Sequence, residues 1–348
     1  MITTVIDPSK GPVVLCIMDG WGHSPDPEHN AVARARTPVF DQLWSHCPHS
    51  FLAASGADVG LPDGQVGNSE VGHMNIGAGR VVIQDLPRLN EAARNGSLQA
   101  HAALKELVST LQHTGGTAHV VGLLSAGGVH AHQDHILAVV NGLVEAGSTV
   151  VIHGFTDGRD VLPRDAGISL QNFVADLPEN ASIGSLTGRY FGMDRDHRWD
   201  RTQKAYDAIA RGRAEHHADD AIQALQTGYV RGESDEFLSA TIIGDYAGMR
   251  DGDGLVMMNF RADRARQLLD CLYRPEFTSC DTQPIALCPG LGMTSYSAAL
   301  DGFVTRLYPP VVFADPRGRA VAAACLRQLL LAATEQCPHV AFFFTGGD

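Results

Sequence analysis

The sequence lacks most features that would place a chain outside the class of ordinary globular proteins. Its seven cysteines are odd in number and form no C-x-x-C pair, which predicts reduced thiols in a cytosol rather than a disulfide framework. The apolar run near the N-terminus covers only residues 13–18, and no basic stretch precedes it. That run is too short for a signal peptide or a membrane span, so we expect a cytoplasmic protein that does not bind membranes.

Positive charge is also scarce. The chain has 26 basic residues against 39 acidic ones, and its formal net charge is −13. Such a balance repels nucleic acid and anionic membranes, so we expect neither as a partner. If the substrate is an anion, a local cluster of arginines must reverse this field.

What is present is a repeated change between short apolar runs and helical stretches. The length of 348 residues is enough for two domains. Short apolar runs followed by helical or turn-like stretches predict an α/β protein with parallel sheets. The expected strands are 13–18, 119–125, 148–158, 253–260 and, last in the chain, 339–344.

Asp19 directly follows the first expected strand, in "MDGWG". Ligands of open α/β sheets bind beyond the carboxyl ends of the strands, and a carboxylate there suits a hard metal ion. The alternative is a turn aspartate that stabilises the "DG" bend. Asp19 taken alone does not separate the two.

Ser69 stands in the glycine-rich stretch "GNSEVGHMNIGAG", with no lysine beside it and no G-x-S-x-G frame. The stretch predicts a helix start, where free backbone N–H groups can receive an anion. A serine that only caps the helix is the alternative. No His–Asp pair is readable nearby, so activation by a metal ion is the better route to a nucleophile.

Histidines cluster in "GGVHAHQDH", which holds His130, His132 and His135. The spacing resembles a metal site, although exposed histidines at the start of a helix also fit it. His130, which follows two glycines and a valine, could instead hydrogen-bond a substrate.

Arginines gather in three segments that follow expected strands. Arginine suits bidentate binding of carboxylate and phosphate groups, and three such segments in an acidic protein indicate an anion site. We interpret Arg198, Arg201 and Arg266 as surface charges with acidic neighbours. The candidate binding residues are Arg159 and Asp160, Arg189 and Arg195, and Arg261 and Arg264.

Together these stretches closely resemble cofactor-independent (2,3-bisphosphoglycerate-independent) phosphoglycerate mutase. The resemblance covers most of the chain and implies an α/β fold, in which an alkaline-phosphatase-like domain holds an inserted transferase domain. The implied boundaries are 1–83 and 309–348 for the first domain, incomplete here, and 84–308 for the insertion. The matching stretches are "MDGWG", "GQVGNSEVGHMNIGAGR", "SAGGVHAH", "TDGRD", "TGRYFGMDRDHRWDR", "IGDYAGMRDGDG" and "NFRADRARQ".

The resemblance also implies roles for single residues. Ser69 matches the serine that is transiently phosphorylated and contacts one of two manganese ions, and Asp19 matches another ligand of that ion. We expect Asp160 to transfer protons to and from the glycerate hydroxyls. The residues that match those holding the phosphoglycerate are His130, Arg159, Asp160, Arg189, Arg195, Arg261 and Arg264.

Two departures from the family pattern affect the expected activity. Gln336, in "TEQCPHV", stands where the family has a catalytic lysine, and glutamine brings no positive charge to the phosphoryl group. Family members continue beyond residue 348, and that segment carries the Asp and His residues that complete both metal sites. We therefore expect that residues 1–348 alone are not a competent mutase, and that an uncovered strand at 339–344 favours aggregation.

The predicted function is interconversion of 3-phosphoglycerate and 2-phosphoglycerate through a phosphoserine intermediate, as in glycolysis and gluconeogenesis, by a monomeric isomerase. One alternative is a non-catalytic or fragmentary chain that only binds anions. Gln336 and the few metal ligands favour it, whereas the intact Ser69 and arginines count against it. A metal-dependent phosphomonoesterase is the third reading. The large arginine-bearing insertion disfavours that reading, because a hydrolase need not retain its alcohol product.

Overall fold

The computed structural model describes residues 11–309, 317–333, 337 and 339–345. Contacts within the chain divide it into unit 1, Met1–Ile83 with Val312–Asp348, and unit 2, Gln84–Val311. Gln336 lies outside the described residues. The roles that the sequence assigns to the domains stay a prediction.

Unit 2 is built on one eight-stranded sheet in the order β4-β5-β3-β2-β1-β6-β7-β8. All neighbours are parallel except β3 and β5, so β4 and β5 run against the other six strands. The strands are β1 Ala118–Leu124, β2 Val150–Thr156, β3 Ala181–Gly188, β4 His216–Ala218, β5 Thr241–Ile243, β6 Gly254–Met257, β7 Gly290–Gly292 and β8 Val304–Arg306.

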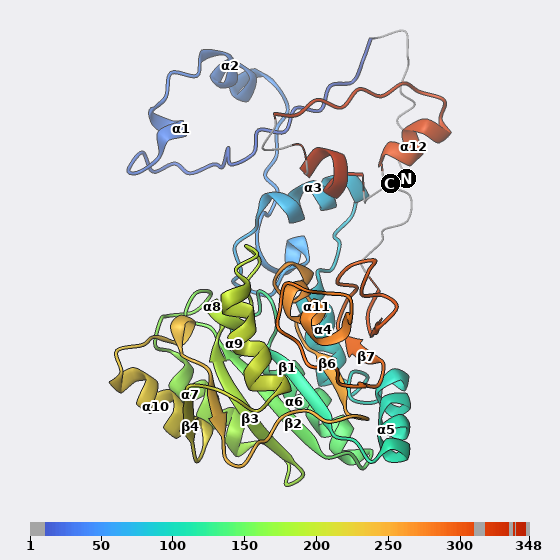
Figure 1. Ribbon diagram of the computed structural model, residues 1–348. Helices are drawn as coiled ribbons and strands as arrows, with labels where there is room; N and C mark the ends of the chain where they lie inside the picture. Colours follow the sequence, from blue (N-terminus) through green and yellow to red (C-terminus); the bar gives the residue numbers. More distant parts are fainter. Residues whose placement is uncertain (1–10, 310–316, 334–336, 338, 346–348) are drawn as a thin grey trace. The chain divides into compact units, whose positions relative to one another are not determined.

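Helices cover both faces of this sheet (Figure 1). Val120 of β1 packs in one apolar cluster with α5, α6, α7 and α10, whereas Val121 packs in another with α9 and α11. A strand buried on both faces reads as a continuous apolar run, which is why β1 and β6 could be found from the sequence. The helices of unit 2 are α4 Asp85–Arg94, α5 Ala102–Thr114, α6 Gln133–Glu145, α7 Ala166–Ala175, α8 Arg189–Gly192, α9 Trp199–Ala210, α10 Ala221–Val230 and α11 Arg266–Tyr273, with short 3-10 turns η3 Asp235–Phe237 and η4 Ala262–Arg264.

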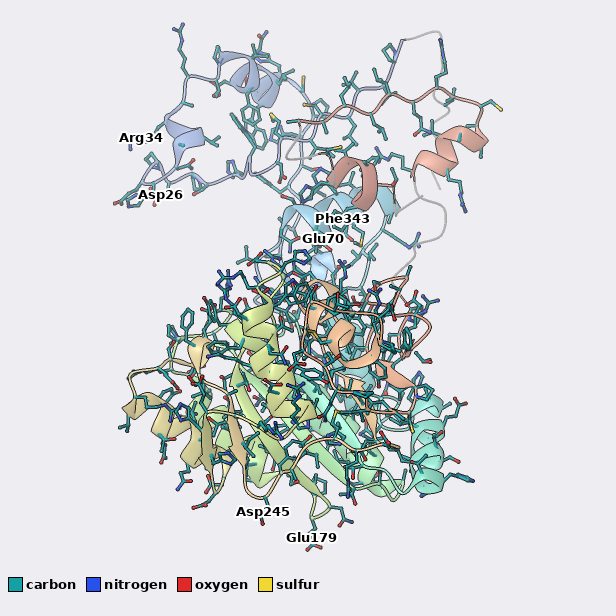
Figure 2. All side chains as sticks on the ribbon, viewed as in Figure 1. Asp26, Arg34, Glu70, Glu179, Asp245 and Phe343 are labelled. Atoms are coloured by element: carbon teal, nitrogen blue, oxygen red, sulfur yellow. A yellow bond between two sulfur atoms is a disulfide. The ribbon has the colours of Figure 1, made fainter. Side chains whose placement is uncertain are left out.

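The reversed direction of β5 relative to β3 can be followed in Figure 2. Glu179 precedes β3 and Asp245 follows β5, yet their side chains project at the same end of unit 2. This is what antiparallel pairing of the two strands requires, with Leu186 opposite Thr241. The expected α/β class with a mainly parallel sheet is thus confirmed for unit 2.

Unit 1 has helices and no strand among its described residues. Its largest described helix, α3, packs on η2 and η6, and its buried apolar cluster consists of Val59, Leu61 and Val71. Trp44, which is partly buried, stacks on the exposed His49 in a separate group of rings. The elements are α1 Ala31–Arg34, α2 Pro38–His46, η2 Gly56–Val59, α3 Ser69–Ala78, α12 Arg317–Ala323 and η6 His339–Phe343.

Two strand predictions in unit 1 are wrong. Residues 13–18 are extended but unpaired and exposed, with Val14 at 80% of its full accessibility. A strand needs a hydrogen-bonded neighbour, and the described part of unit 1 offers none to this segment. Residues 339–343 form the π-helical turn η6. The prediction failed here because a short apolar run does not by itself distinguish a strand from a helix.

The expectation that all cysteines are reduced is also wrong. Cys271 and Cys280 form a disulfide, because α11 and the loop after it bring their Cα atoms within 5.9 Å. Scattered spacing could not reveal this pair. Among the described helices, none is long and apolar enough to cross a membrane.

Candidate functional site

Ser69 and Asp19 meet in unit 1 although 50 residues separate them in the sequence. The Ser69 hydroxyl donates to Oδ2 of Asp19 over 2.5 Å. Asn68, not Ser69, caps α3, since its side chain accepts from the N–H of Val71. The capping alternative for Ser69 is therefore excluded, and its hydroxyl instead contacts a residue far away in the sequence.

Asp19 also occupies the turn that the sequence suggested. The N–H of Trp21 donates to the carbonyl of Met18, and Gly20 takes a φ of 77°, a conformation that glycine allows without strain. The turn leaves the carboxylate of Asp19 free to reach Ser69. Asp19 thus lies in a turn and also contacts Ser69, and its role as a metal ligand stays a prediction.

The pair could supply two oxygen ligands to a divalent metal ion. A protein metal site usually has at least three protein ligands, and the described residues contain no group of three or more His, Cys, Asp or Glu side chains that could hold a metal ion. Asp19 and Ser69 thus fit part of a metal site and not a whole one.

The histidine triplet does not form a metal site. Nδ1 of His132 accepts from the N–H of Asp134, and Nε2 of His135 lies 2.7 Å from Oδ1 of Asn90. His130 points elsewhere, toward Asp263. Their lone pairs therefore do not converge on one point.

The arginine-bearing segments of unit 2 follow the carboxyl ends of adjacent parallel strands. Asp157 comes after β2, Arg189 after β3, His130 after β1 and Arg261 after β6. Because β3, β2, β1 and β6 are neighbours in that order, these segments meet at one edge of the sheet. Sequence spacing alone could not give this order.

Asp157 is the centre of the first group. One Nη of Arg189 donates to Asp157 and to Asp160, each over 2.5 Å, and Ser125 donates to Asp157 over 2.6 Å. Asp157 also accepts from the N–H of Asp160, which fixes the turn that carries Arg159. The hydrogen bonds and the charge of Arg189 outweigh burial and lower the pKa of Asp157. Sequence reasoning missed this buried aspartate.

A second group forms around Asp263. Arg195 donates to its Oδ2 over 2.8 Å, and Nε of Arg261 lies 3.5 Å from its Oδ1. Arg264 donates to the carbonyl of Met193 over 3.1 Å. Burial, together with the charges of Arg195, Arg159 and Arg189, lowers the pKa of Arg264, so cations crowd here.

A cavity of about 190 Å³ connects the two groups. Four arginines share its wall, with two aromatic rings and three carboxylates between them. Its lining residues are Arg159, Arg189, Tyr190, Asp194, Asp196, Arg201, Glu236, Phe237 and Arg264.

Arg201 was interpreted as a surface charge, and the structure contradicts this. Its guanidinium lies 3.9 Å from the centre of the Tyr190 ring and donates to Asp194, which is buried. A guanidinium held on a ring face by a buried carboxylate is fixed in place. No local sequence signal separates Arg201 from Arg198, whose partner Asp200 is exposed.

Comparisons with known proteins identify the family of this chain. The family model described as "BPG-independent PGAM N-terminus" matches residues 89–298, more than half of the chain. The 2,3-bisphosphoglycerate-independent phosphoglycerate mutase of Gluconobacter oxydans is 50% identical over 97% of this chain. The chain belongs to this family of mutases. The enzyme of the same name from Rhodopseudomonas palustris is 48% identical over 98% of the chain.

The family membership fixes the fold class as well. A Leishmania mexicana phosphoglycerate mutase, solved at low cobalt concentration, superposes with a TM-score of 0.74 and 29% identity over 95% of this chain. The fold class is that of a phosphatase-like domain with an inserted α/β transferase domain. The chain spans about two thirds of the length of these relatives, 66% of the first and 63% of the Leishmania protein.

Proposed function

We propose that this mutase-family chain acts on 3-phosphoglycerate and 2-phosphoglycerate and moves the phosphoryl group between them by way of Ser69. The observation that carries the proposal is the cavity whose wall holds four arginines in a protein of net charge −13. Such a wall suits a small ligand with a phosphate and a carboxylate, because each group can accept paired hydrogen bonds from a guanidinium.

The proposed roles of single residues are those that the resemblance implies. Arg159, Arg189, Arg195, Arg261 and Arg264 bind the anionic groups, and Asp160 exchanges a proton with the glycerate hydroxyl. In the transfer, the Ser69 hydroxyl releases its proton to solvent and its Oγ forms the new bond to phosphorus. The bond from phosphorus to the glycerate oxygen breaks, and that oxygen takes a proton from Asp160. The return step reverses these changes on the other hydroxyl.

A divalent metal ion, which we propose to be Mn²⁺ in two sites as the resemblance implies, would supply positive charge to the serine oxygen and the phosphoryl group. Asp19 and Ser69 would hold part of one site. Because the described residues bring only these two ligands together, we expect ligand binding without full turnover from the chain as it stands.

The test begins with titration of 3-phosphoglycerate into the full chain. We expect binding that Arg264→Ala weakens by about 1.5–3 kcal/mol for each charged hydrogen bond lost, whereas Arg198→Ala changes little. Unchanged binding in Arg264→Ala would count against the proposal. Coupled assays with added Mn²⁺ then separate two enzyme classes: 2-phosphoglycerate indicates a mutase, and free phosphate indicates a phosphomonoesterase.

The role of Ser69 is tested by mass spectrometry after incubation with 3-phosphoglycerate and Mn²⁺. We expect phosphate on the Ser69 peptide, none there in Ser69→Ala, and no change in Ser45→Ala, which alters an exposed serine of unit 1. Phosphate on a different serine would refute the assignment. We further propose a monomer in the cytoplasm, to be checked by light scattering and cell fractionation.

A further inference from the structure

Asp263 lies among three of the candidate binding residues and is itself an anion. Its Oδ2 accepts from Arg195 over 2.8 Å. Its Oδ1 lies 3.5 Å from Nε of Arg261 and 3.6 Å from Nδ1 of His130. This carboxylate therefore occupies a position among groups otherwise suited to bind the substrate.

Oδ1 of Asp263 and Nδ1 of His130 are both buried, and neither has a hydrogen-bond partner among the described residues. Oδ1 of Asp263 faces Nδ1 of His130 at 3.6 Å and Nε of Arg261 at 3.5 Å. Leaving two such buried atoms unpaired costs free energy. Whether they attract or repel each other depends on whether Nδ1 of His130 carries a proton.

The charge states of the two groups are set by their surroundings. The hydrogen bond from Arg195 and the charges of Arg261 and Arg195 overcome burial and lower the pKa of Asp263, so it is a carboxylate at neutral pH. Burial and the charges of Arg189 and Arg261 outweigh Asp263 and Asp160 and lower the pKa of His130 to about 4. His130 is thus a neutral ring with one N–H.

A neutral imidazole has two tautomers. If Nε2 carries the hydrogen, the lone pair of Nδ1 faces a carboxylate oxygen and the two repel. If Nδ1 carries it, the positive N–H edge of the ring lies 3.6 Å from the carboxylate oxygen and the two attract. We infer that Asp263 is a positioning residue that holds His130 in the Nδ1–H form and leaves the Nε2 lone pair to accept a hydrogen bond.

The inference assigns His130 to a different part of the ligand from the arginines. A bare lone pair repels phosphate and carboxylate oxygens but accepts from an alcohol. Given the proposed function, on which this step rests, Nε2 of His130 accepts from the free hydroxyl of the phosphoglycerate. The arginines are left to bind the two anionic groups.

The first experiment is a long-range ¹H–¹⁵N spectrum of the full chain labelled at histidine, recorded without ligand at about pH 8, where ordinary histidines are neutral. We expect a proton on Nδ1 of His130 and none on Nε2. His132 is a control in the same spectrum, because its Nδ1 accepts from the N–H of Asp134 and should carry no proton.

Two variants test whether Asp263 is the cause. Asp263→Leu keeps a similar shape but offers no acceptor, so His130 should lose its preference for Nδ1–H while His132 is unchanged. Arg195→Ala removes the other partner of Asp263 and should leave the tautomer as it is. Nε2–H in the wild-type chain would overturn the inference, as would Nδ1–H that persists in Asp263→Leu. If Asp263→Leu does not fold, the wild-type and Arg195→Ala spectra still decide.

The second experiment compares 3-phosphoglycerate with 3-(phosphonooxy)propanoate, which lacks the 2-hydroxyl. Asp263→Leu should weaken binding of the first about fivefold more than binding of the second, the effect of one neutral hydrogen bond. Equal losses would overturn the assignment of His130 to the hydroxyl. Failure of both ligands to bind the wild-type chain would refute the proposed function and this assignment, and the spectra alone would then decide the role of Asp263.

Discussion

Unit 2 and unit 1 come from one chain but differ in how many of their apolar side chains are buried and in how fully their polar groups are hydrogen-bonded. In unit 2 the strand β1 is buried along its whole length, and the carboxylate of Asp157 accepts from two side chains and two backbone N–H groups. In unit 1 the apolar cluster has three residues, and Val13, Val14 and Leu15 are exposed.

The difference shows that an apolar segment of sequence is not necessarily a buried one. Residues 13–18 are as apolar as β1, yet only β1 has a neighbouring strand on each side. Burial on both faces stabilises a strand, whereas an apolar run without partners gains nothing from its composition. Stability should therefore be concentrated in unit 2, and substitutions can test this.

The largest effect is expected for Arg189→Ala. This change leaves the buried carboxylate of Asp157 without its charged partner, which costs about 3–5 kcal/mol in unfolding free energy. Arg198→Ala breaks the exposed pair with Asp200 and should cost less than about 1 kcal/mol. Chemical denaturation, together with hydrogen exchange of the amides in β1, β2 and β3, measures the unfolding free energy of both variants. Similar losses in the two would contradict the view that the buried charges of unit 2 depend on their partners.

A matched pair of leucines tests the core directly. Leu123 of β1 is fully buried, whereas Leu15 keeps 50% of its accessibility. Leu123→Ala should cost about 2–5 kcal/mol, because transfer and cavity terms add. Leu15→Ala should stay within about 0.5 kcal/mol. A large cost for Leu15→Ala in chemical denaturation would show that residues 13–18 are buried in solution.

Much of unit 2 could be predicted from the sequence, because its central strands are buried and paired on both sides. The expected strands 119–125, 148–158 and 253–260 are present as β1, β2 and β6, because buried parallel strands read as continuous apolar runs. The two strands expected in unit 1, at 13–18 and 339–344, are not formed among its described residues, since strand formation depends on partners that local sequence does not specify.

The candidate site shows the same limit. Motifs located the arginines and Ser69, but not which carboxylate each would meet. Asp157 is buried under Ser125 and Arg189, and Arg201 stacks on Tyr190. These contacts join segments that are far apart in the sequence, so only the order of the strands brings them together.

Acid should weaken unit 2 by a smaller amount. Burial lowers the pKa of His130 and of His135 to about 4. Between that value and the ordinary pKa near 6.5, the unfolded chain binds more protons, so stability falls as the pH falls through this range. From pH 7 to pH 5 the loss is about 2 kcal/mol for each histidine at most.

A variant identifies the source of that loss. His135→Asn keeps a donor for Oδ1 of Asn90 but cannot titrate, so the dependence of unfolding free energy on pH should become shallower. Replacing the exposed His113 by Asn should leave the slope unchanged. An unchanged slope in His135→Asn would mean that His135 is not held neutral by burial.

The smallest effect sharpens the comparison most, because the same local change can be made in both units. Asn68 caps α3 of unit 1 by accepting from Val71, and Asp220 caps α10 of unit 2 by accepting from Gln223. Replacing either by alanine removes one cap, worth about 1 kcal/mol. In unit 2 the loss should lower the protection of the sheet as well as the helix, because α10 packs on β3, β4 and β5 within one core. In unit 1 it should raise exchange only in α3 and in the turns η2 and η6 that pack on it, because the buried apolar cluster there has three residues. Hydrogen exchange resolved by peptide distinguishes the two responses. If Asn68→Ala were to lower protection throughout the described part of unit 1, that unit would be cooperative after all.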